Sequence, residues 1–432
     1  MIEKILVAIW DKISNPGPAR KAARIVAVLL ILIVGTATVY RASRSHGSQY
    51  DDFYNFSKDL LYDKINIYQA YSFERTTIAK YPPFFSILFA PLVPIPFLLG
   101  AALWFIVGIT LTYFSSRAIA KMGWHLFKGK GTAPPTSWWV VPIVMTLVIV
   151  MSNLATSQVN IFIFSLVVFS LYSFLKKKDH LAGLFIGVAT AIKLTPGLFV
   201  LYFAYKGRWK PVLWATLGGL ACWGVLLPLV MGPEYYMEVM RSWIAMLQSY
   251  VTEGSSVDGL AGYKHTNQSM EAFFYRYFTH TPANGGFDNF YVNLLNLPMD
   301  TAAWIVKALK ILLLLLLAWV CRNPLKERSN PMLMFEFSLV IMATLYISPI
   351  SWINHYVVMV LPFATAFYWI SSLEKEDKTR GRMLTALLLA VGLTYLTHPI
   401  FLAFSLAFFG SLFLFINMAG YLKSLQSGKR TA

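Results

Sequence analysis

The sequence predicts an all-α protein that crosses a membrane many times. Only 13% of its 432 residues are charged and 57% are hydrophobic, whereas soluble proteins carry about 25% charged residues. Apolar runs of 15 to 25 residues recur along the chain, and such runs are typical of bilayer-spanning helices. The net charge of +17 fits basic cytoplasmic loops better than a surface for nucleic acid, because membrane proteins gather Lys and Arg on their cytoplasmic side.

The chain is expected to form one integral membrane domain, 23–422, between a cytoplasmic surface helix within 1–22 and a basic tail, 423–432. In "MIEKILVAIWDKI" (1–13) the isoleucines share one helical face, as in helices that lie on a membrane. The first apolar run is long enough to stay in the bilayer and no cleavage pattern follows it, so no cleavable signal peptide is expected. Crossings are predicted at 23–40, 97–115, 137–151, 160–175, 211–231, 302–320, 332–347, 356–371, 384–396 and 399–421.

Two stretches do not fit straight spans. "YPPFFSILFAPLVPIP" (81–96) contains five prolines, which predicts a short, bent interfacial helix. The stretch 181–205 has basic clusters at both ends and Lys193 and Pro196 near its middle. A single crossing would place one cluster on the wrong side, so we expect two half-helices that enter the membrane and return, with protein or water around the turn.

The basic residues orient the chain. With the N-terminus in the cytoplasm, cytoplasmic segments hold 25 Lys and Arg and outer loops hold 9; Lys193, Lys307 and Lys310 fall within apolar runs. This asymmetry places both termini inside. It also gathers four polar and aromatic stretches on the outer face of the cytoplasmic membrane, and this clustering predicts a reaction centre there. They are loop 41–82, "TSQVN" (156–160), "KHTNQSMEAFFYR" (264–276) and "SPISWINHY" (348–356).

The opening outer loop carries adjacent carboxylates, Asp51 and Asp52, in "SQYDDFYNF". They fit a solvated acidic loop or caps for the helix that begins near Phe53. They also fit a general base, because a carboxylate beside an aromatic wall can have its pKa tuned for proton transfer.

Lys193 and His355 are the next candidates. A lysine at membrane depth is costly and usually faces an internal cavity; it lies too far from both basic ends to reach the surface easily. It would suit a bound phosphate. His355 fits a structural histidine at a membrane edge, but Ser351, Trp352 and Asn354 beside it add donors and an aromatic platform for a sugar or phosphate.

Further donors lie in the large outer loop, with weaker claims: Lys264, Asn267, Gln268 and Arg276. The triplets that begin at Asn55 and Asn267 also match the glycosylation sequon, a pattern with many false matches. Gly183 and Gly187 form a small-xxx-small pair that favours helix packing. Cys222 and Cys321 suggest neither a disulfide framework nor a metal-ligand spacing.

These motifs in this order resemble glycosyltransferase family 87, the polyprenyl-phosphate-dependent mannosyltransferases of GT-C architecture. The matching features span most of residues 50 to 360: Asp52-Phe53, "YPP…APL", Trp104, "SQVN", "AGLFIGVATAIKLTP", "NQS" and "SPISWINHY". The resemblance implies a bundle of about 10–12 transmembrane helices that includes broken half-helices. It also implies inverting hexose transfer, mannose above all, from a polyprenyl-phosphate-sugar to a lipid-linked or cell-envelope glycan on the outer face.

Carried over by position, Asp52 matches the family's catalytic aspartate and Asp51 is its neighbour, while Lys193 and His355 match positions near the donor phosphate. Phe56 stands where the family has Tyr, and Asn354 where it often has a charged residue or His, which leaves acceptor choice open. The resemblance leaves a divalent cation open, although the sequence has no clear ligand cluster. The other candidate substrate-binding residues are Tyr81, Gln158, Asn160, Asn267, Gln268, Arg276, Ser351, Trp352 and Asn354.

A transporter or flippase of lipid-linked sugars is the alternative, because broken helices and a mid-membrane lysine are common in transporters. Against it, no internal repeat is evident, and the inner face offers only positive charge.

Overall fold

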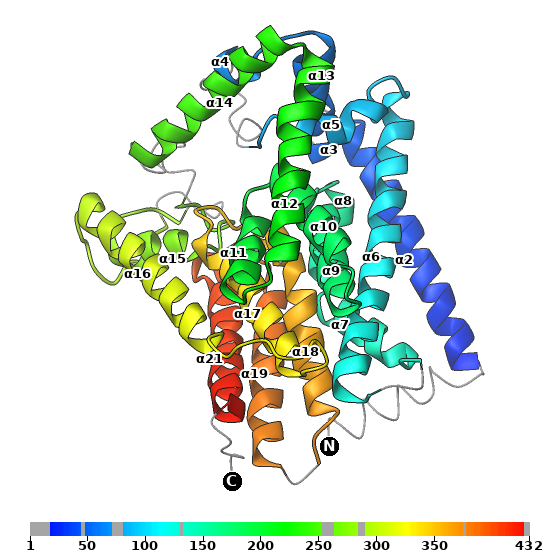
Figure 1. The fold of residues 1–432 in the computed structure, drawn as a ribbon, viewed down its shortest axis with the longest axis vertical. Coiled ribbons are helices and arrows are strands. Elements are labelled where there is room, and N and C mark those ends of the chain that lie inside the picture. The colour runs from blue at the N-terminus through cyan, green and yellow to red at the C-terminus, as the bar shows by residue number, and fades with distance from the viewer. Residues whose placement is uncertain are drawn as a thin grey trace.

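The structure is a computed structural model that describes residues 18–44, 48–70, 81–129, 133–252, 263–283, 290–374 and 377–426. The predicted surface helix at 1–13 and the end of the basic tail lie outside these residues. Regular secondary structure in the described part is helical (Figure 1). The segments, with η for 3-10 and π turns, are α2 Pro18–Ala42, α3 Gln49–Ser57, η1 Lys58–Tyr62, α4 Ile67–Ala70, α5 Phe85–Phe89, η2 Ala90–Leu92, α6 Phe97–Phe127, α7 Thr136–Met145, α8 Leu147–Ala155, α9 Asn160–Leu175, α10 Asp179–Ile192, η3 Thr195–Gly197, α11 Leu198–Tyr205, α12 Trp209–Leu220, η4 Ala221–Leu226, α13 Leu227–Met231, α14 Pro233–Thr252, α15 Met270–Phe278, α16 Met299–Val320, α17 Met332–Ile347, η6 Ile353–Met359, α18 Val360–Ile370, α19 Lys378–Tyr395, α20 Pro399–Ala403 and α21 Leu406–Gln426.

Six described segments are long and apolar enough to cross a membrane, and the bent pair α7–α8 adds a seventh if it counts as one span. The six are α2, α6, α12 to α13, α16, η6 with α18, and α21. Four apolar segments are shorter: α9, α10, η3 with α11, and α17. The predicted class, an all-α polytopic membrane protein, is therefore confirmed, although several predicted crossings are short, bent or interrupted.

Helix α17 forms the centre of the bundle. Apart from Thr344, its side chains from Leu333 to Tyr346 are buried, because α11, α16, α18 and α21 pack around it. A helix that is apolar all round is expected to be buried in this way. The last turn of α17 borders the candidate site.

The crossing predicted at 137–151 is divided into two helices, because α7 and α8 meet at Thr146 with a bend of 71°. Pro142 lies inside α7 and has no N–H to donate to the carbonyl of Trp138 four residues earlier. The hydroxyl of Tyr368 donates to that carbonyl instead, and its ring stacks on Trp138 with centroids 4.2 Å apart. Helix α18 thus supplies the bond that the proline removes.

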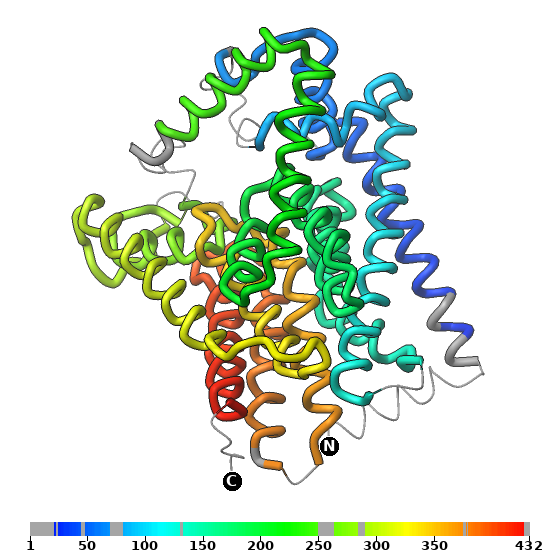
Figure 2. The backbone as a smooth tube through the Cα atoms, viewed as in Figure 1, coloured from blue at the N-terminus to red at the C-terminus, as the bar shows by residue number. Residues whose placement is uncertain are grey.

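Both ends of the α10–α11 hairpin lie at the same end of the bundle, as the basic clusters predicted (Figure 2). At the start of α10, Arg328 pairs with Asp179 through contacts of 2.6 and 3.0 Å. Just after α11, Lys206 Nζ donates to the carbonyls of Cys321 (2.5 Å) and Asn323 (2.7 Å). The loop 321–328 therefore contacts both the start of α10 and the end of α11.

The hairpin packs closely on α12 through its two glycines. A Cβ at Gly183 would lie 2.4 Å from the carbonyl oxygen of Pro211, and one at Gly187 would lie 2.4 Å from that of Ala215. Only glycine allows the two backbones to come this close. The predicted packing role of the pair is confirmed.

The C-terminal crossings differ from the prediction. The stretch 384–396 belongs to α19, whose first turns carry Arg380 and Arg382, so it is not among the segments apolar enough to span. The stretch 399–421 is divided into α20 and α21 at Ser405, which has a φ of 55°. A left-handed residue ends a helix.

Helices α3, α5 and α14 form a layer at one end of the bundle, opposite the start of α10 and the end of α11 (Figure 1). Within it, the amide of Asn66 donates to Glu238 (3.0 Å) and Ser242 (3.1 Å) of α14. The five-proline stretch forms α5 and η2, as predicted, and Phe53 of α3 packs on Phe85 with centroids 4.8 Å apart. This layer brings together parts of the outer loops predicted at 41–82 and 232–301.

Candidate active site

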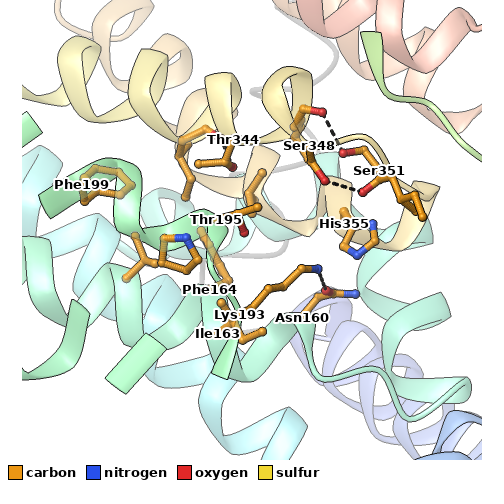
Figure 3. A pocket seen from close by; sticks show the side chains of 16 residues that line it. Asn160, Ile163, Phe164, Lys193, Thr195, Phe199, Thr344, Ser348, Ser351 and His355 are labelled. Atoms are coloured by element: carbon orange, nitrogen blue, oxygen red, sulfur yellow. Dashed lines mark hydrogen bonds between the residues drawn. The ribbon is translucent and has the colours of Figure 1, made fainter. Parts of the chain in front are cut away.

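A cavity beside the tip of the hairpin brings together four of the predicted site residues. Lys193, Asn160, His355 and Ser351 all line it (Figure 3). The space between its lining residues is about 510 Å³, open solvent at its mouth included. The walls come from α9, the α10–η3 turn, α17 and η6.

Lys193 reaches the cavity because α10 stops at Ile192. Pro196 has no N–H to donate to the carbonyl of Ile192 four residues earlier, so α10 does not continue through this turn. Lys193 is accordingly extended, with φ −151° and ψ 131°. The indole of Trp223 donates to the carbonyl of Ala191 at 3.2 Å and satisfies that end of the helix. The Lys193 ammonium then donates to Asn160 Oδ1 at 3.3 Å (Figure 3).

The orientation of Asn160 is set by its neighbours. Its amide nitrogen donates to Gln158 Oε1 at 3.3 Å and lies 3.5 Å from Asn153 Oδ1. With the nitrogen engaged there, the amide oxygen faces Lys193. Gln158 therefore acts on the cavity through Asn160, and the structure places its own side chain in a second hollow beside Trp104.

Two residues of α8, Ser152 and Asn153, were not among the sequence candidates. Asn153 Nδ2 donates to the carbonyl of Asn354 at 2.9 Å, and Ser152 Oγ donates to Asn354 Oδ1 at 2.7 Å. These bonds fix the backbone just before His355. The available signal was an asparagine within an apolar run, since such a group needs a partner at membrane depth.

His355 lies on η6 and faces Lys193 across the cavity (Figure 3). Its Nδ1 is buried and has no hydrogen-bond partner among the described residues. The ring lies 6.2 Å from that of Trp352, centroid to centroid. A buried nitrogen without a partner at the edge of a cavity indicates a site prepared for a ligand.

Asn267 and Gln268 use their side chains within the protein. Asn267 Oδ1 accepts from the backbone of Ser351 (2.9 Å) and its Nδ2 donates to Pro349 (3.0 Å), while Gln268 Nε2 donates to Leu402 at 2.7 Å. Asn267 and Trp352 also form an isolated β-bridge. The "NQS" turn thus supports the "SPISW" turn, and Asn267, only 1% exposed, is closed to a glycan.

Arg276 is fully buried behind this turn. Its Nη1 donates to the carbonyls of Tyr263 (2.9 Å), Lys264 (2.8 Å) and Asn267 (2.8 Å), and its Nη2 donates to Ser405 (2.6 Å). Burial lowers the pKa of Arg276 to about 10, so the group stays charged at neutral pH. This geometry favours support of the turn over contact with a substrate.

Arg276→Met should therefore lower stability more than it lowers the activity of the protein that remains folded. The change leaves the buried carbonyls of Tyr263 and Asn267 without their donor, whereas that of Lys264 still accepts from the amide of Asn267; the expected loss is at least about 2 kcal/mol. Thermal unfolding of the purified protein in detergent measures it, with Arg241→Met, at an exposed position of α14, as the matched control. An Arg276→Met protein of normal stability that fails to bind substrate would instead favour direct contact.

Asp51 and Asp52 lie in the first turn of α3, which Ser48 caps by accepting from the amide of Tyr50. Asp52 accepts from Gln49 Nε2 at 2.8 Å, and Asp51 accepts from Asn55 Nδ2 at 3.0 Å. Neither carboxylate lines the cavity. The backbone of Gln49 nevertheless donates to Thr156 at 3.1 Å, so α3 is joined to the turn that leads to Asn160.

Tyr81 lies near the carboxylate of Asp52. Burial, and then the charge of Asp52, raise the pKa of Tyr81 above its usual value, so its phenol stays protonated. Its ring stacks on Phe85 with centroids 4.3 Å apart. In the described part of the chain, no three His, Cys, Asp or Glu side chains are grouped closely enough to hold a metal ion.

Comparison with known families identifies the chain. The model of glycosyltransferase family 87 matches residues 80–349, which is more than half of the sequence and includes the cavity's lysine and most of its lining. The chain belongs to glycosyltransferase family 87. This membership confirms the resemblance and makes the protein a membrane glycosyltransferase.

Two curated proteins from Mycobacterium tuberculosis are similar to the chain. One, a polyprenol-phosphate-mannose-dependent α-(1-2)-phosphatidylinositol pentamannoside mannosyltransferase, is 26% identical over 81% of this chain and 73% of its own length. The other, a polyprenol-phosphate-mannose-dependent α-(1-2)-phosphatidylinositol mannoside mannosyltransferase, is 28% identical over 46% of this chain and 50% of its own length. No solved structure matches.

Proposed function

We propose that the chain transfers mannose, with inversion, from a polyprenyl-phosphate-mannose donor to a lipid-linked or cell-envelope glycan. The observation that carries this proposal is the meeting of Lys193 and His355 at one cavity in a family 87 membrane protein. The names of the two curated relatives support the donor, and their phosphatidylinositol mannosides support a glycolipid as the class of acceptor.

The proposed reaction is a direct displacement at the anomeric carbon. An acceptor hydroxyl forms the new bond from one face while the bond to the phosphate oxygen breaks on the other. Asp52 takes the hydroxyl proton, and Asp51, its neighbour, contributes less. Phosphate leaves as an anion and needs no acid, so a fixed cation and hydrogen-bond donors are sufficient in a site that excludes water.

The remaining candidates are assigned by their contacts. Lys193 and His355 hold the donor phosphate, with Asn160 orienting Lys193. Tyr81 keeps Asp52 in place from the side of α5. Ser351 belongs to the cavity wall. Gln158 supports Asn160, and Asn267 and Gln268 support Ser351. Arg276 and Trp352 contact Asn267, and Asn354 precedes His355 in η6.

The site opens on the outer face of the cytoplasmic membrane, with both termini in the cytoplasm. The excess of Lys and Arg in the loops at the opposite end of the bundle supports this orientation. One membrane domain, 23–422, carries the reaction between the surface helix within 1–22 and the tail at 423–432. The donor's lipid tail can then remain in the bilayer throughout.

The purified protein in detergent tests the proposal. With polyprenyl-phosphate-mannose and a glycolipid acceptor, it should release free polyprenyl phosphate and form a mannoside of inverted configuration, without a sealed vesicle. Mass spectrometry and NMR of the product measure both results. Movement of the lipid-linked sugar across sealed vesicles without release of polyprenyl phosphate would favour a flippase.

A further inference from the structure

Three hydroxyls on one side of the cavity have already used their protons. Thr344 Oγ1 donates to the carbonyl of Ile341 (2.6 Å), Ser348 Oγ to that of Ile350 (2.7 Å) and Ser351 Oγ to that of Leu345 (2.7 Å). A carbonyl can only accept, so the direction of each bond is fixed. We name these three residues the hydroxyl wall.

The hydroxyl wall can offer only lone pairs to a ligand. A hydroxyl has one proton and two lone pairs, and no described residue donates to these three oxygens. A phosphate also carries only acceptors, so it gains nothing from this wall. A ligand group that carries O–H donors does.

The opposite side of the cavity has the complementary chemistry. Lys193 has three N–H donors, and among the described residues one of them meets an acceptor, Asn160. Thr195 lines the same cavity and its hydroxyl makes no hydrogen bond with the described residues. No carboxylate in the described part of the chain pairs with Lys193. Figure 3 shows the lysine and the hydroxyl wall on different sides of the space.

We infer that the cavity binds the donor in one direction, with the phosphate at Lys193 and Thr195 and the hydroxyls of the transferred sugar at Thr344, Ser348 and Ser351. This rests on the proposed function, in which the donor is a sugar on a lipid phosphate. The sugar is bonded directly to that phosphate, so a phosphate at Lys193 places the sugar within the same cavity. The hydroxyl wall then selects a sugar by where its O–H groups point.

Thr344→Val tests the assignment, because valine keeps the shape of threonine and removes the hydroxyl. Affinities for polyprenyl phosphate and for polyprenyl-phosphate-mannose are measured on the purified protein without any acceptor. The variant should bind the mannosyl donor roughly 5- to 10-fold more weakly, as for one or two neutral hydrogen bonds, and bind polyprenyl phosphate as the wild type does. Ser348→Ala should act in the same direction.

Thr216→Val is the matched control. Thr216 also donates to a carbonyl of its own helix, that of Val212 four residues earlier (3.1 Å), but it lies on an exposed face of α12. It should change neither affinity. Equal weakening of both ligands by Thr344→Val, or of neither, would overturn the inference.

These measurements also show whether the hydroxyl wall binds the sugar of the donor or the sugar of the acceptor. If Thr344→Val left donor affinity unchanged but raised the KM of the glycan acceptor, the hydroxyl wall would bind the acceptor sugar and the assignment would be wrong. A wild-type protein that binds neither polyprenyl phosphate nor polyprenyl-phosphate-mannose would overturn the proposed function itself. Overturning the inference about the hydroxyl wall is a separate outcome, in which the wild type binds both ligands and Thr344→Val does not selectively weaken binding of the mannosyl donor.

Discussion

Asp52→Asn is expected to lower sugar transfer by roughly 10²–10⁴-fold, the contribution typical of a general base. The amide keeps the size of the side chain but has no basicity at neutral pH. In the structure Asp52 accepts one bond from Gln49 Nε2 at 2.8 Å, and a rotated amide can keep a bond there. Expression and membrane insertion should therefore be normal, and the loss should fall on the rate of transfer.

Asp51→Asn is the matched comparison, one residue away on the same helix. Its carboxylate is held by Asn55 within α3, so a smaller loss is expected. A transfer rate of Asp52→Asn above about a tenth of the wild-type rate would exclude Asp52 as the base. Equal losses in the two variants would mean that the two carboxylates share the task.

Lys193→Met should weaken binding of polyprenyl phosphate by about 10- to 100-fold, the effect of losing a hydrogen bond to a charged group. The structure gives this ammonium a neutral amide as its protein partner, and a charge at membrane depth is costly. Removing it should leave thermal stability unchanged or raise it. Reduced affinity in a protein of normal or greater stability is the expected signature of a ligand-binding residue.

Lys307→Met is the control for this variant. Lys307 also falls within an apolar span, but it lies on the exposed face of α16 over the ring of Trp304, 4.7 Å from its centroid. It should bind polyprenyl phosphate as the wild type does. Normal affinity in Lys193→Met, measured in the same detergent, would remove Lys193 from the donor site.

The sequence was most informative where a charge conflicted with its surroundings. Basic clusters at both ends of one apolar stretch, with Lys193 at its middle, are incompatible with a simple crossing and predicted the hairpin that the structure contains. The four polar stretches assigned to one face do meet: Gln49 contacts Thr156, Asn160 and Ser351 line one cavity, and Asn267 pairs with Trp352. Electrostatic constraints of this kind act over whole segments, so they hold even when the predicted boundaries are wrong by a few residues.

The direction of individual hydrogen bonds was not accessible from the sequence. Arg276 and Asn267 have the chemistry of ligand-binding residues, but their side chains point back to backbone carbonyls and amides. Thr344 looks like any threonine near the end of an apolar helix, and its contribution depends on where its proton goes. Likewise, the 71° bend between α7 and α8 was not predicted from the sequence, although Pro142 removes a helical hydrogen bond within α7.

The account requires that α3 and the tip of the hairpin face a space reached from outside the cell. Labelling of single cysteines with a membrane-impermeant thiol reagent tests this directly, after replacement of the buried Cys222 and Cys321. Lys58→Cys, just after α3 at a side chain that is 46% exposed, should react in intact cells. Lys178→Cys, exposed at the foot of the hairpin, should react only after permeabilisation. The reverse pattern would place Asp52 on the cytoplasmic side and contradict the account.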